Sequence, residues 1–261
     1  NMDLHLKGKS IIVTGGAKGI GLGICKVLAN EGALPIIIGR NETDNQSTLA
    51  EIQSLNGQAH YITAELTNPA DCERAIKDAL SIAGRIDGLV NNAGVNDGVG
   101  LEGGNYDSFM ASLHKNLVHY YLMAQYALPE LKKNKGSIVN IGSKTAETGQ
   151  GNTSAYAASN GGRNALTREW AVELLKYGIR VNAVIVAECF TPLYETWIKT
   201  FDHPEEKLKS ITDKIPLGHR MTTEEEIAHM VAFLLSEKSS HTTGQLIHVD
   251  GGYTHLDRAL G

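Results

Sequence analysis

The sequence predicts an α/β protein: a single-domain, Rossmann-type doubly wound parallel sheet with helices on both faces. Short Val- and Ile-rich runs alternate with longer helical patterns along the chain. Several of these runs are continuously apolar, which suits strands covered on both faces. The first run leads directly into a glycine-rich turn that opens a helix. Repeated β-α-β units of this kind form a parallel sheet of about seven strands.

The expected elements follow one another without an internal linker or repeat, so we expect one domain over residues 1–261. The strands are expected at Ser10–Thr14, Pro35–Gly39, Ala59–Thr63, Gly88–Asn91, Ser137–Gly142, Ile179–Ile185 and Leu246–Val249. The helices are expected at 19–31, 45–56, 69–84, 105–132, 154–177 and 222–236. Asn68 before Pro69 is typical of a helix start. Thr222 and Glu225 have the spacing of a capping box for the last helix.

The segment 187–216 breaks this alternation, because it holds three prolines and several aromatic residues. Long insertions after the carboxyl end of a strand often form lids over binding sites. We therefore expect a substrate lid here, with a purely structural helical excursion as the alternative.

Composition limits the classes of function. The 261 residues are 42% hydrophobic and 20% charged, as in soluble globular proteins. A net charge of −5 argues against nucleic acid or an anionic membrane as partner. No apolar run reaches the ~18 residues of a membrane span, and residues 1–9 lack the pattern of a secretion signal. The three cysteines, Cys25, Cys72 and Cys189, have no metal-site spacing, so we expect no metal and a reducing, cytoplasmic location.

The turn Thr14–Gly21 predicts a dinucleotide site. Gly15, Gly19 and Gly21 allow a tight turn and a close approach of the backbone to a pyrophosphate. The helix that follows offers free N–H groups and a positive dipole to the phosphates.

The end of the second strand favours NADP, with NAD still possible. An acidic residue there would bind the ribose 2′-hydroxyl, but the chain has Gly39-Arg40. Arg40 and Lys18 are two cations that would attract a 2′-phosphate. Glu42 and Asp44 lie nearby and weaken the argument, and both cations could simply be solvated.

Three further residues suggest alcohol–carbonyl chemistry. Ser143, at the end of a strand, can hold a substrate hydroxyl by a hydrogen bond. Tyr156, in the first turn of a helix, can take its proton while a hydride leaves for the nicotinamide. Asn116, within a helix, can anchor a water for proton relay. Each also has an ordinary reading, as a capping serine, a core tyrosine and a helix-kink asparagine.

Taken together, these residues resemble the short-chain dehydrogenase/reductase family over almost the whole chain. The marks are Thr14–Gly21, Asn91-Asn92-Ala93-Gly94, Asn116, Ser143, and Tyr156 thirteen residues after that serine. The resemblance assigns catalysis to Ser143, Tyr156, Asn116 and the position of Asn160. It assigns cofactor binding to Gly15, Lys18, Gly19, Ile20, Gly21, Arg40, Glu65, Leu66, Asn92, Ala93, Gly94, Tyr156, Asn160 and Thr191.

Asn160 departs from the family pattern, which has a lysine four residues after the tyrosine. That lysine binds the nicotinamide ribose and favours ionisation of the tyrosine, as a nearby cation does. Asparagine can still bond the ribose or a water, but it carries no charge. Lys144 is a poor replacement, because neighbouring strand residues point to opposite faces. Asn160 is either an engineered substitution or a natural variant with reduced or relocated activity, and we hypothesise that it weakens catalysis.

Polar residues where the pocket is expected favour a polyhydroxylated sugar over a steroid or acyl chain. The candidate substrate contacts are Asn96, Ser143, Gln150, Tyr156, Glu188, Tyr194 and Trp197. Several runs, among them Asn91–Glu102, Thr191–Phe201 and Val249–Leu260, resemble bacterial L-fucose dehydrogenases. That resemblance implies oxidation of the anomeric hydroxyl of L-fucose, or of a related aldose, to a lactone.

The resemblance also implies a homotetramer built on the helices at 105–132 and 154–177, and the tail Gly251–His255 could complete a neighbour's site. Two other functions remain open. Asn160 suits a non-catalytic dinucleotide sensor. A reductase of a ketone or 3-oxoacyl substrate would need a basic patch at the lid for an acyl carrier. Lys199, Lys207, Lys209 and Lys214 could form it, although acidic residues interleave with them.

Overall fold

Seven parallel strands form the central sheet in a computed structural model that describes residues 1–256. They are β1 (Ser10–Thr14), β2 (Leu34–Gly39), β3 (His60–Thr63), β4 (Gly88–Asn91), β5 (Ser137–Ser143), β6 (Arg180–Val186) and β7 (Leu246–His248). The order across the sheet is β3-β2-β1-β4-β5-β6-β7. The order therefore reverses between β1 and β4, which in open α/β sheets is where a ligand crevice forms.

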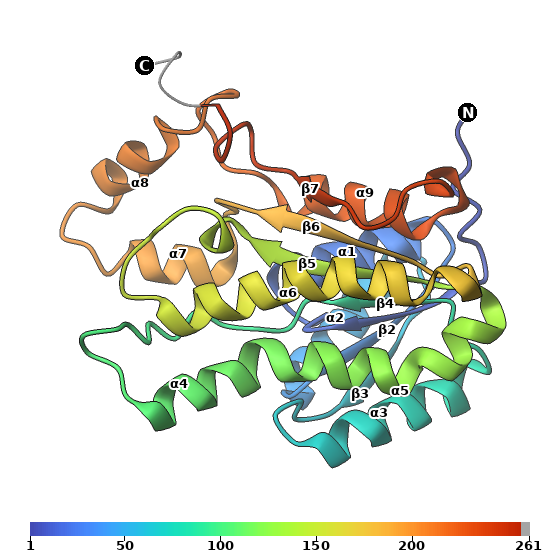
Figure 1. Ribbon diagram of the computed structural model, residues 1–261. Helices are drawn as coiled ribbons and strands as arrows, with labels where there is room; N and C mark the ends of the chain where they lie inside the picture. The colour runs from blue at the N-terminus through green and yellow to red at the C-terminus, as the bar shows by residue number, and fades with distance from the viewer. Residues whose placement is uncertain (257–261) are drawn as a thin grey trace.

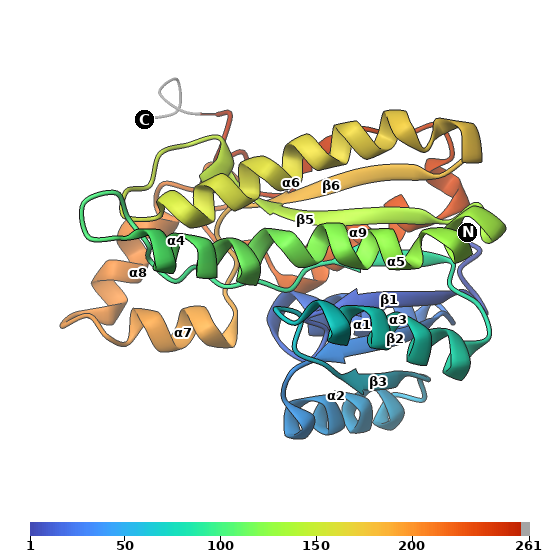
Figure 2. The same cartoon turned by 60° about the horizontal axis from the view of Figure 1, so that its bottom comes forward.

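Helices cover both faces of this sheet (Figures 1 and 2). They are α1 (Gly19–Asn30), α2 (Glu42–Ser54), α3 (Pro69–Ala83), α4 (Tyr106–Leu113), α5 (His119–Asn134), α6 (Ser154–Glu173), α7 (Pro192–Ile198), α8 (Pro204–Thr212) and α9 (Glu224–Leu235). The core under α1, α2 and α9 includes Ile24, Ile52 and Val231, and the core under α3, α5 and α6 includes Ile76, Met123 and Trp170.

The strand β1 shows why the sequence forms this arrangement. Ile11 and Val13 pack into the core on one face, while Ile12 packs into the core on the other. Side chains alternate across a strand, so a continuously apolar strand must be buried from both sides. The predicted fold class is thus confirmed, and all seven strands lie within a residue of their expected bounds.

Two local expectations need correction. The capping box of α9 is formed by Thr223 and Glu226, one residue later than expected. The helix expected at 105–132 is two helices, α4 and α5, joined by a π-helical turn at His114–Val118. The segment 187–216 contains two short helices, α7 and α8, and lies beyond one end of the sheet (Figure 1). The wrong cap arose because Thr222 and Thr223 are equally good capping residues, each with a glutamate three positions on.

Cys25 and Cys72 are buried, and burial raises the pKa of the Cys72 thiol to about 11. Within residues 1–256 no helix has both the length and the apolar character of a bilayer span. The last five positions of the expected domain, and the end of the run Val249–Leu260, lie outside the described residues.

Candidate active site

The candidate site lies at the carboxyl edge of the sheet, where β1, β4, β5 and β6 end. Because parallel strands end at the same edge, the glycine-rich turn, the Asn92–Gly94 segment and Ser143 gather there. The lid helices α7 and α8 follow the end of β6 at that edge (Figure 2).

The glycine-rich turn requires glycine for steric reasons. Gly15 has a φ of +64°, which L side chains rarely adopt. A Cβ on Gly21 would collide with the carbonyl oxygen of Gly15. In the described chain, no side chain caps the N-terminus of α1, so its first N–H groups stay available. Such a helix end fits the pyrophosphate of a dinucleotide.

Thr14 and Asn92 tie this turn to the end of β4. The Thr14 hydroxyl accepts hydrogen bonds from the backbone N–H groups of Asn92 (2.9 Å) and Ala93 (3.1 Å). The Asn92 side chain donates to the carbonyl oxygens of Thr14 and Gly15. The two segments expected to contact the cofactor therefore form one rigid unit.

The cations near the second strand differ from expectation. Lys18 is not a free cation, because its ammonium lies 2.9 Å from the carboxylate of Asp44. Glu42 is turned away toward Thr63 and Tyr61. Arg40 is exposed and forms no ion pair with any residue in 1–256. The attraction for a 2′-phosphate therefore depends mainly on Arg40.

Other expected cofactor contacts lie around the turn. Thr191 caps α7 through its hydroxyl, and its methyl group lies 3.6 Å from where a Cβ on Gly19 would be. The lid therefore begins against the cofactor turn. At the end of β3, the Glu65 carboxylate accepts hydrogen bonds from Thr67, and Leu66 is buried. Ile20 is half-buried against the core.

The catalytic candidates come from three elements. Ser143 ends β5, and its hydroxyl accepts hydrogen bonds from the N–H and the hydroxyl of Thr145. Tyr156 is half-buried in the first turn of α6. Asn116 is fully buried in the π-helical turn, and its amide oxygen accepts from the N–H of Val95 at 2.7 Å. The amide of Asn116 thus holds the segment after Gly94 in place, and its water relay remains a prediction.

Asn160 is buried and faces into the protein. Its amide nitrogen donates to the carbonyl of Tyr156 (2.9 Å). Its amide oxygen accepts a hydrogen bond from Nη1 of Arg163 (3.0 Å). Each polar group has one partner and can form another hydrogen bond, so the ribose contact expected from the sequence stays a prediction.

Arg163 is a site residue that the sequence analysis missed. Only 3% of it is exposed, and its Nε donates to the carbonyl of Asn116 at 2.7 Å. Its guanidinium carbon lies 4.2 Å from the ring centre of Tyr120 and 6.0 Å from that of Tyr156. One signal was available: Tyr156, Asn160 and Arg163 are spaced i, i+4 and i+7, which places them on one face of a helix.

A largely buried ion pair lies next to Ser143 in the chain. Lys144 follows that serine in the short 3₁₀ turn Lys144–Ala146 and pairs with Glu188. The Lys144 ammonium also lies 4.4 Å from the ring centre of Tyr253. Burial and the Glu188 carboxylate raise the pKa of Tyr194. Lys144 is thus engaged with Glu188 and Tyr253, which lie in the segment expected to form a lid and in the C-terminal segment.

The remaining substrate candidates lie farther out. Asn96 and Gln150 are exposed on loops, and Trp197 is about half-exposed within an aromatic row of the lid. That row consists of Phe190, Tyr194, Trp197 and Phe201. We find no hydrogen bond among residues 1–256 that links Asn96 or Gln150 to Ser143.

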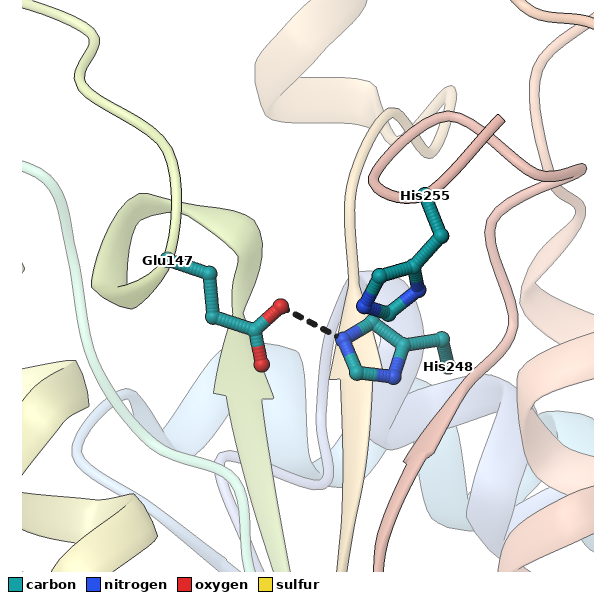
Figure 3. A group of neighbouring side chains, drawn as sticks. All are labelled: Glu147, His248 and His255. Atoms are coloured by element: carbon teal, nitrogen blue, oxygen red, sulfur yellow. Dashed lines mark hydrogen bonds and ion pairs between the residues drawn. The ribbon is translucent and has the colours of Figure 1, made fainter. Parts of the chain in front are cut away.

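The C-terminal segment brings His255 beside His248 and Glu147 (Figure 3). His248, at the end of β7, lies 2.7 Å from the carboxylate of Glu147, and the ring of His255 packs on it at 4.5 Å. The donor atoms of the three side chains lie within 4.8 Å of one another. Two imidazoles and a carboxylate are a donor set that suits zinc. Spacing along the sequence gave no sign of this group, because the fold joins positions 101 residues apart.

Comparisons with known proteins agree with this architecture. A family model described as "Enoyl-(Acyl carrier protein) reductase" matches residues 15–254. The chain is 34% identical to the 3-oxoacyl-[acyl-carrier-protein] reductase FabG of Thermotoga maritima, over 95% of this chain and 99% of that protein. It is 31% identical to the L-fucose dehydrogenase of Bos taurus, over 100% of this chain and 95% of the relative. The crystal structure of the Cj0485 dehydrogenase superposes with a TM-score of 0.94 at 46% identity, covering 100% and 99% of the two chains.

Proposed function

Because the chain belongs to the short-chain dehydrogenase/reductase family, we propose that it oxidises a sugar with NADP. The proposed substrate is L-fucose or a related aldose, and the reacting group is its anomeric hydroxyl. The observation that carries this proposal is the buried pair Lys144–Glu188 beside Ser143. An ion pair with tyrosine neighbours offers donors and acceptors to several hydroxyls, which an acyl chain could not use.

In this reaction Ser143 holds the C1 hydroxyl by a hydrogen bond, and the Tyr156 phenolate takes its proton. The C1–H bond breaks at the same time, so that C1 becomes the carbonyl carbon of a lactone. The oxidised nicotinamide supplies the acceptor for the departing hydride. Glu188, Tyr194 and Lys144 orient the other hydroxyls, and Asn96, Gln150 and Trp197 complete the pocket when the lid closes.

The cofactor preference rests on Arg40. It is exposed next to Gly39, where an acidic residue would exclude a phosphate. Since Asp44 neutralises Lys18, we assign the 2′-phosphate contact to Arg40 and keep NAD as a weaker cofactor.

Exposed apolar side chains support a homotetramer. Tyr106, Tyr121, Val172 and Leu175, on or just after α4, α5 and α6, are between 47% and 76% exposed. These are the elements that the family resemblance assigned to subunit contacts, and an apolar patch is typical of an interface. Light scattering on the purified protein tests this assembly.

A 3-oxoacyl reductase is the second candidate, favoured by the likeness to FabG. The charges in the segment expected to form the lid argue against a 3-oxoacyl reductase. Lys199 pairs with Glu195 and Lys209 with Asp213, so these lysines form solvated pairs and no continuous basic patch.

The deciding experiment measures reduced cofactor at 340 nm with a panel of aldoses and simple alcohols, with NAD and with NADP. We expect L-fucose and NADP to give the highest kcat/KM. L-fucose without activity on either cofactor would remove the sugar assignment. Reduction of acetoacetyl-CoA faster than oxidation of any sugar would favour the second candidate. Cofactor binding without turnover on the whole panel would favour a sensor.

A further inference from the structure

Arg163 is a buried cation without a counter-ion. Only 3% of the residue is exposed, yet it forms no ion pair with any carboxylate in residues 1–256. Its hydrogen bonds go to neutral oxygens, the carbonyls of Asn116 and Ile141 and the amide of Asn160. Its Nη2 has no hydrogen-bond partner within the described part of the chain. Buried charges are normally paired, because an unpaired one costs several kcal/mol.

Two neighbours of the guanidinium cannot balance its charge. Burial and, to a smaller extent, the Arg163 cation lower the pKa of His119 to about 4, so this imidazole is neutral at pH 7. Burial raises the pKa of Tyr120 well above its ordinary value, so that phenol keeps its proton. The Glu65 carboxylate, just after β3, has a smaller and opposite effect: it raises the pKa of His119.

Tyr156 is the ionisable neighbour that remains. It shares a helical face with Arg163, its ring centre is 6.0 Å from the guanidinium carbon, and it is half-buried at the open edge of the sheet. Its hydroxyl has no hydrogen bond to any residue in 1–256. Because the guanidinium is buried, its attraction for a phenolate here would be screened less than that between two charges in bulk water.

We propose that Arg163 supplies the positive charge that Asn160 lacks and thereby stabilises the phenolate of Tyr156. Asn160 then positions the guanidinium through the bond from Nη1, and Arg163 acts on the reaction through Tyr156. This inference rests on the proposed role of Tyr156 as the base.

Nη2 of Arg163 also lies near Gly94, a residue expected to contact the cofactor. A Cβ on Gly94 would lie 2.7 Å from Nη2 and 2.7 Å from the amide oxygen of Asn116. Glycine at 94 therefore leaves room for the guanidinium beside a segment expected to contact the cofactor. The same cation thus lies close to Tyr156 and to this segment.

The competing explanation is a purely structural tie, since Arg163 links the π-helical turn, β5 and α6. The test therefore measures ionisation directly. Tyrosinate absorbance near 295 nm is titrated in the full-length protein and in Tyr156→Phe, and their difference gives the ionisation of Tyr156 without substrate. Arg163→Gln removes the charge and keeps hydrogen-bonding capacity, and Arg163→Lys keeps the charge. Arg168→Gln, an exposed arginine on α6, is the matched control.

We expect Arg163→Gln to move the Tyr156 titration up by about 1–3 pH units, as loss of a nearby cation does. The acid limb of kcat/KM should move by the same amount, while activity above that limb approaches the unmodified level. Arg163→Lys should recover most of the shift, and Arg168→Gln should show none. Equal titrations in Arg163→Gln and the unmodified protein, or a loss of activity that is the same at every pH, would overturn the proposal.

A double-mutant cycle with Asn160→Lys separates the two cations. If one charge suffices, Arg163→Gln lowers kcat/KM at pH 7 by about 10- to 1000-fold with Asn160 present, following the 1–3-unit shift. In the Asn160→Lys background the same change should cost less than about 3-fold. Equal losses in both backgrounds would overturn the proposal. The absorbance titration needs no substrate. A failure to oxidise L-fucose would therefore contradict the proposed function and leave the proposal for Arg163 standing.

Discussion

Two buried cations lie near the catalytic candidates, and they differ in their partners. Lys144 is paired with Glu188, and the two side chains are only 11% and 14% exposed. Arg163 is buried more deeply and faces only neutral groups. A neutralised pair contributes position and hydrogen bonds, whereas an unpaired cation contributes an electric field. We therefore expect changes at Lys144 and Glu188 to affect substrate affinity, and changes around Arg163 to affect the pH dependence of the rate.

The largest expected effect comes from removing the group on which Arg163 acts. Tyr156→Phe should lower kcat by about 10²–10⁴-fold, the usual contribution of a positioned acid or base. In this background Arg163→Gln should have no further effect on the rate, because the phenolate no longer exists. Stopped-flow hydride transfer measures the rate, and quenching of protein fluorescence by NADPH checks that cofactor binding stays within about 3-fold. More than a tenth of the unmodified rate in Tyr156→Phe would contradict this assignment.

Arg40 is a third cation to compare with Lys144 and Arg163, because it is unpaired like Arg163 but exposed to solvent. Arg40→Ala should raise KM for NADP by about 10- to 100-fold, since a hydrogen bond to a charged group contributes about 1.5–3 kcal/mol. KM for NAD should stay unchanged. Lys18→Ala should have a smaller effect, because Asp44 already neutralises Lys18. Initial rates with both cofactors provide the measurement, and an equal loss with NAD and NADP would show that Arg40 does not select between them.

Removing the partner of Lys144 tests whether the Lys144–Glu188 pair acts on substrate affinity. Glu188→Gln leaves Lys144 without its counter-charge, and KM for the sugar should rise by about tenfold for a lost hydrogen bond of about 1.4 kcal/mol. The shape of the pH profile should stay the same. Urea unfolding should show a loss of about 1–3 kcal/mol, as for one partner of a partly buried pair. Glu195→Gln, in an exposed pair with Lys199, should cost less than about 0.5 kcal/mol. A moved acid limb in Glu188→Gln would contradict the division of roles.

The smallest expected effect concerns an exposed pair far from catalysis. The Arg220 guanidinium and the N–H of Thr223 hold the pKa of Glu226 at about 2, below its ordinary value. A lowered carboxyl pKa stabilises the fold above about pH 4.5, and this stabilisation is lost as the pH falls toward 2. Because the pair is exposed, Glu226→Gln should cost less than about 1 kcal/mol at pH 7 and nothing near pH 2. Urea unfolding at several pH values measures this, with Glu225→Gln as control, and a cost independent of pH would contradict the assignment.

The comparison also explains what the sequence could predict. The strands and the glycine-rich turn were predictable because each depends on residues adjacent in the chain, as Gly21 does on Gly15. Ser143 and Tyr156 could be chosen as candidates from their spacing, and their catalytic roles remain predictions. The bonds of Arg163 to Asn116 and Ile141 span 47 and 22 residues, and no local pattern encodes them. The pairing of Lys18 with Asp44 was missed for a related reason, since side-chain direction depends on how α2 follows β2.

The π-helical turn at His114–Val118 restricts how this chain can change in length. A π-helical turn has i→i+5 hydrogen bonds and so holds one residue more than an α-helical turn. Deleting one residue here would close it to an ordinary α-helical turn and would displace the carbonyl of Asn116 that Arg163 binds. Insertions elsewhere between α4 and β5, such as at the end of α5, would leave these contacts in place. Variants of this protein should therefore accept insertions and deletions at loop ends and reject them within these five residues.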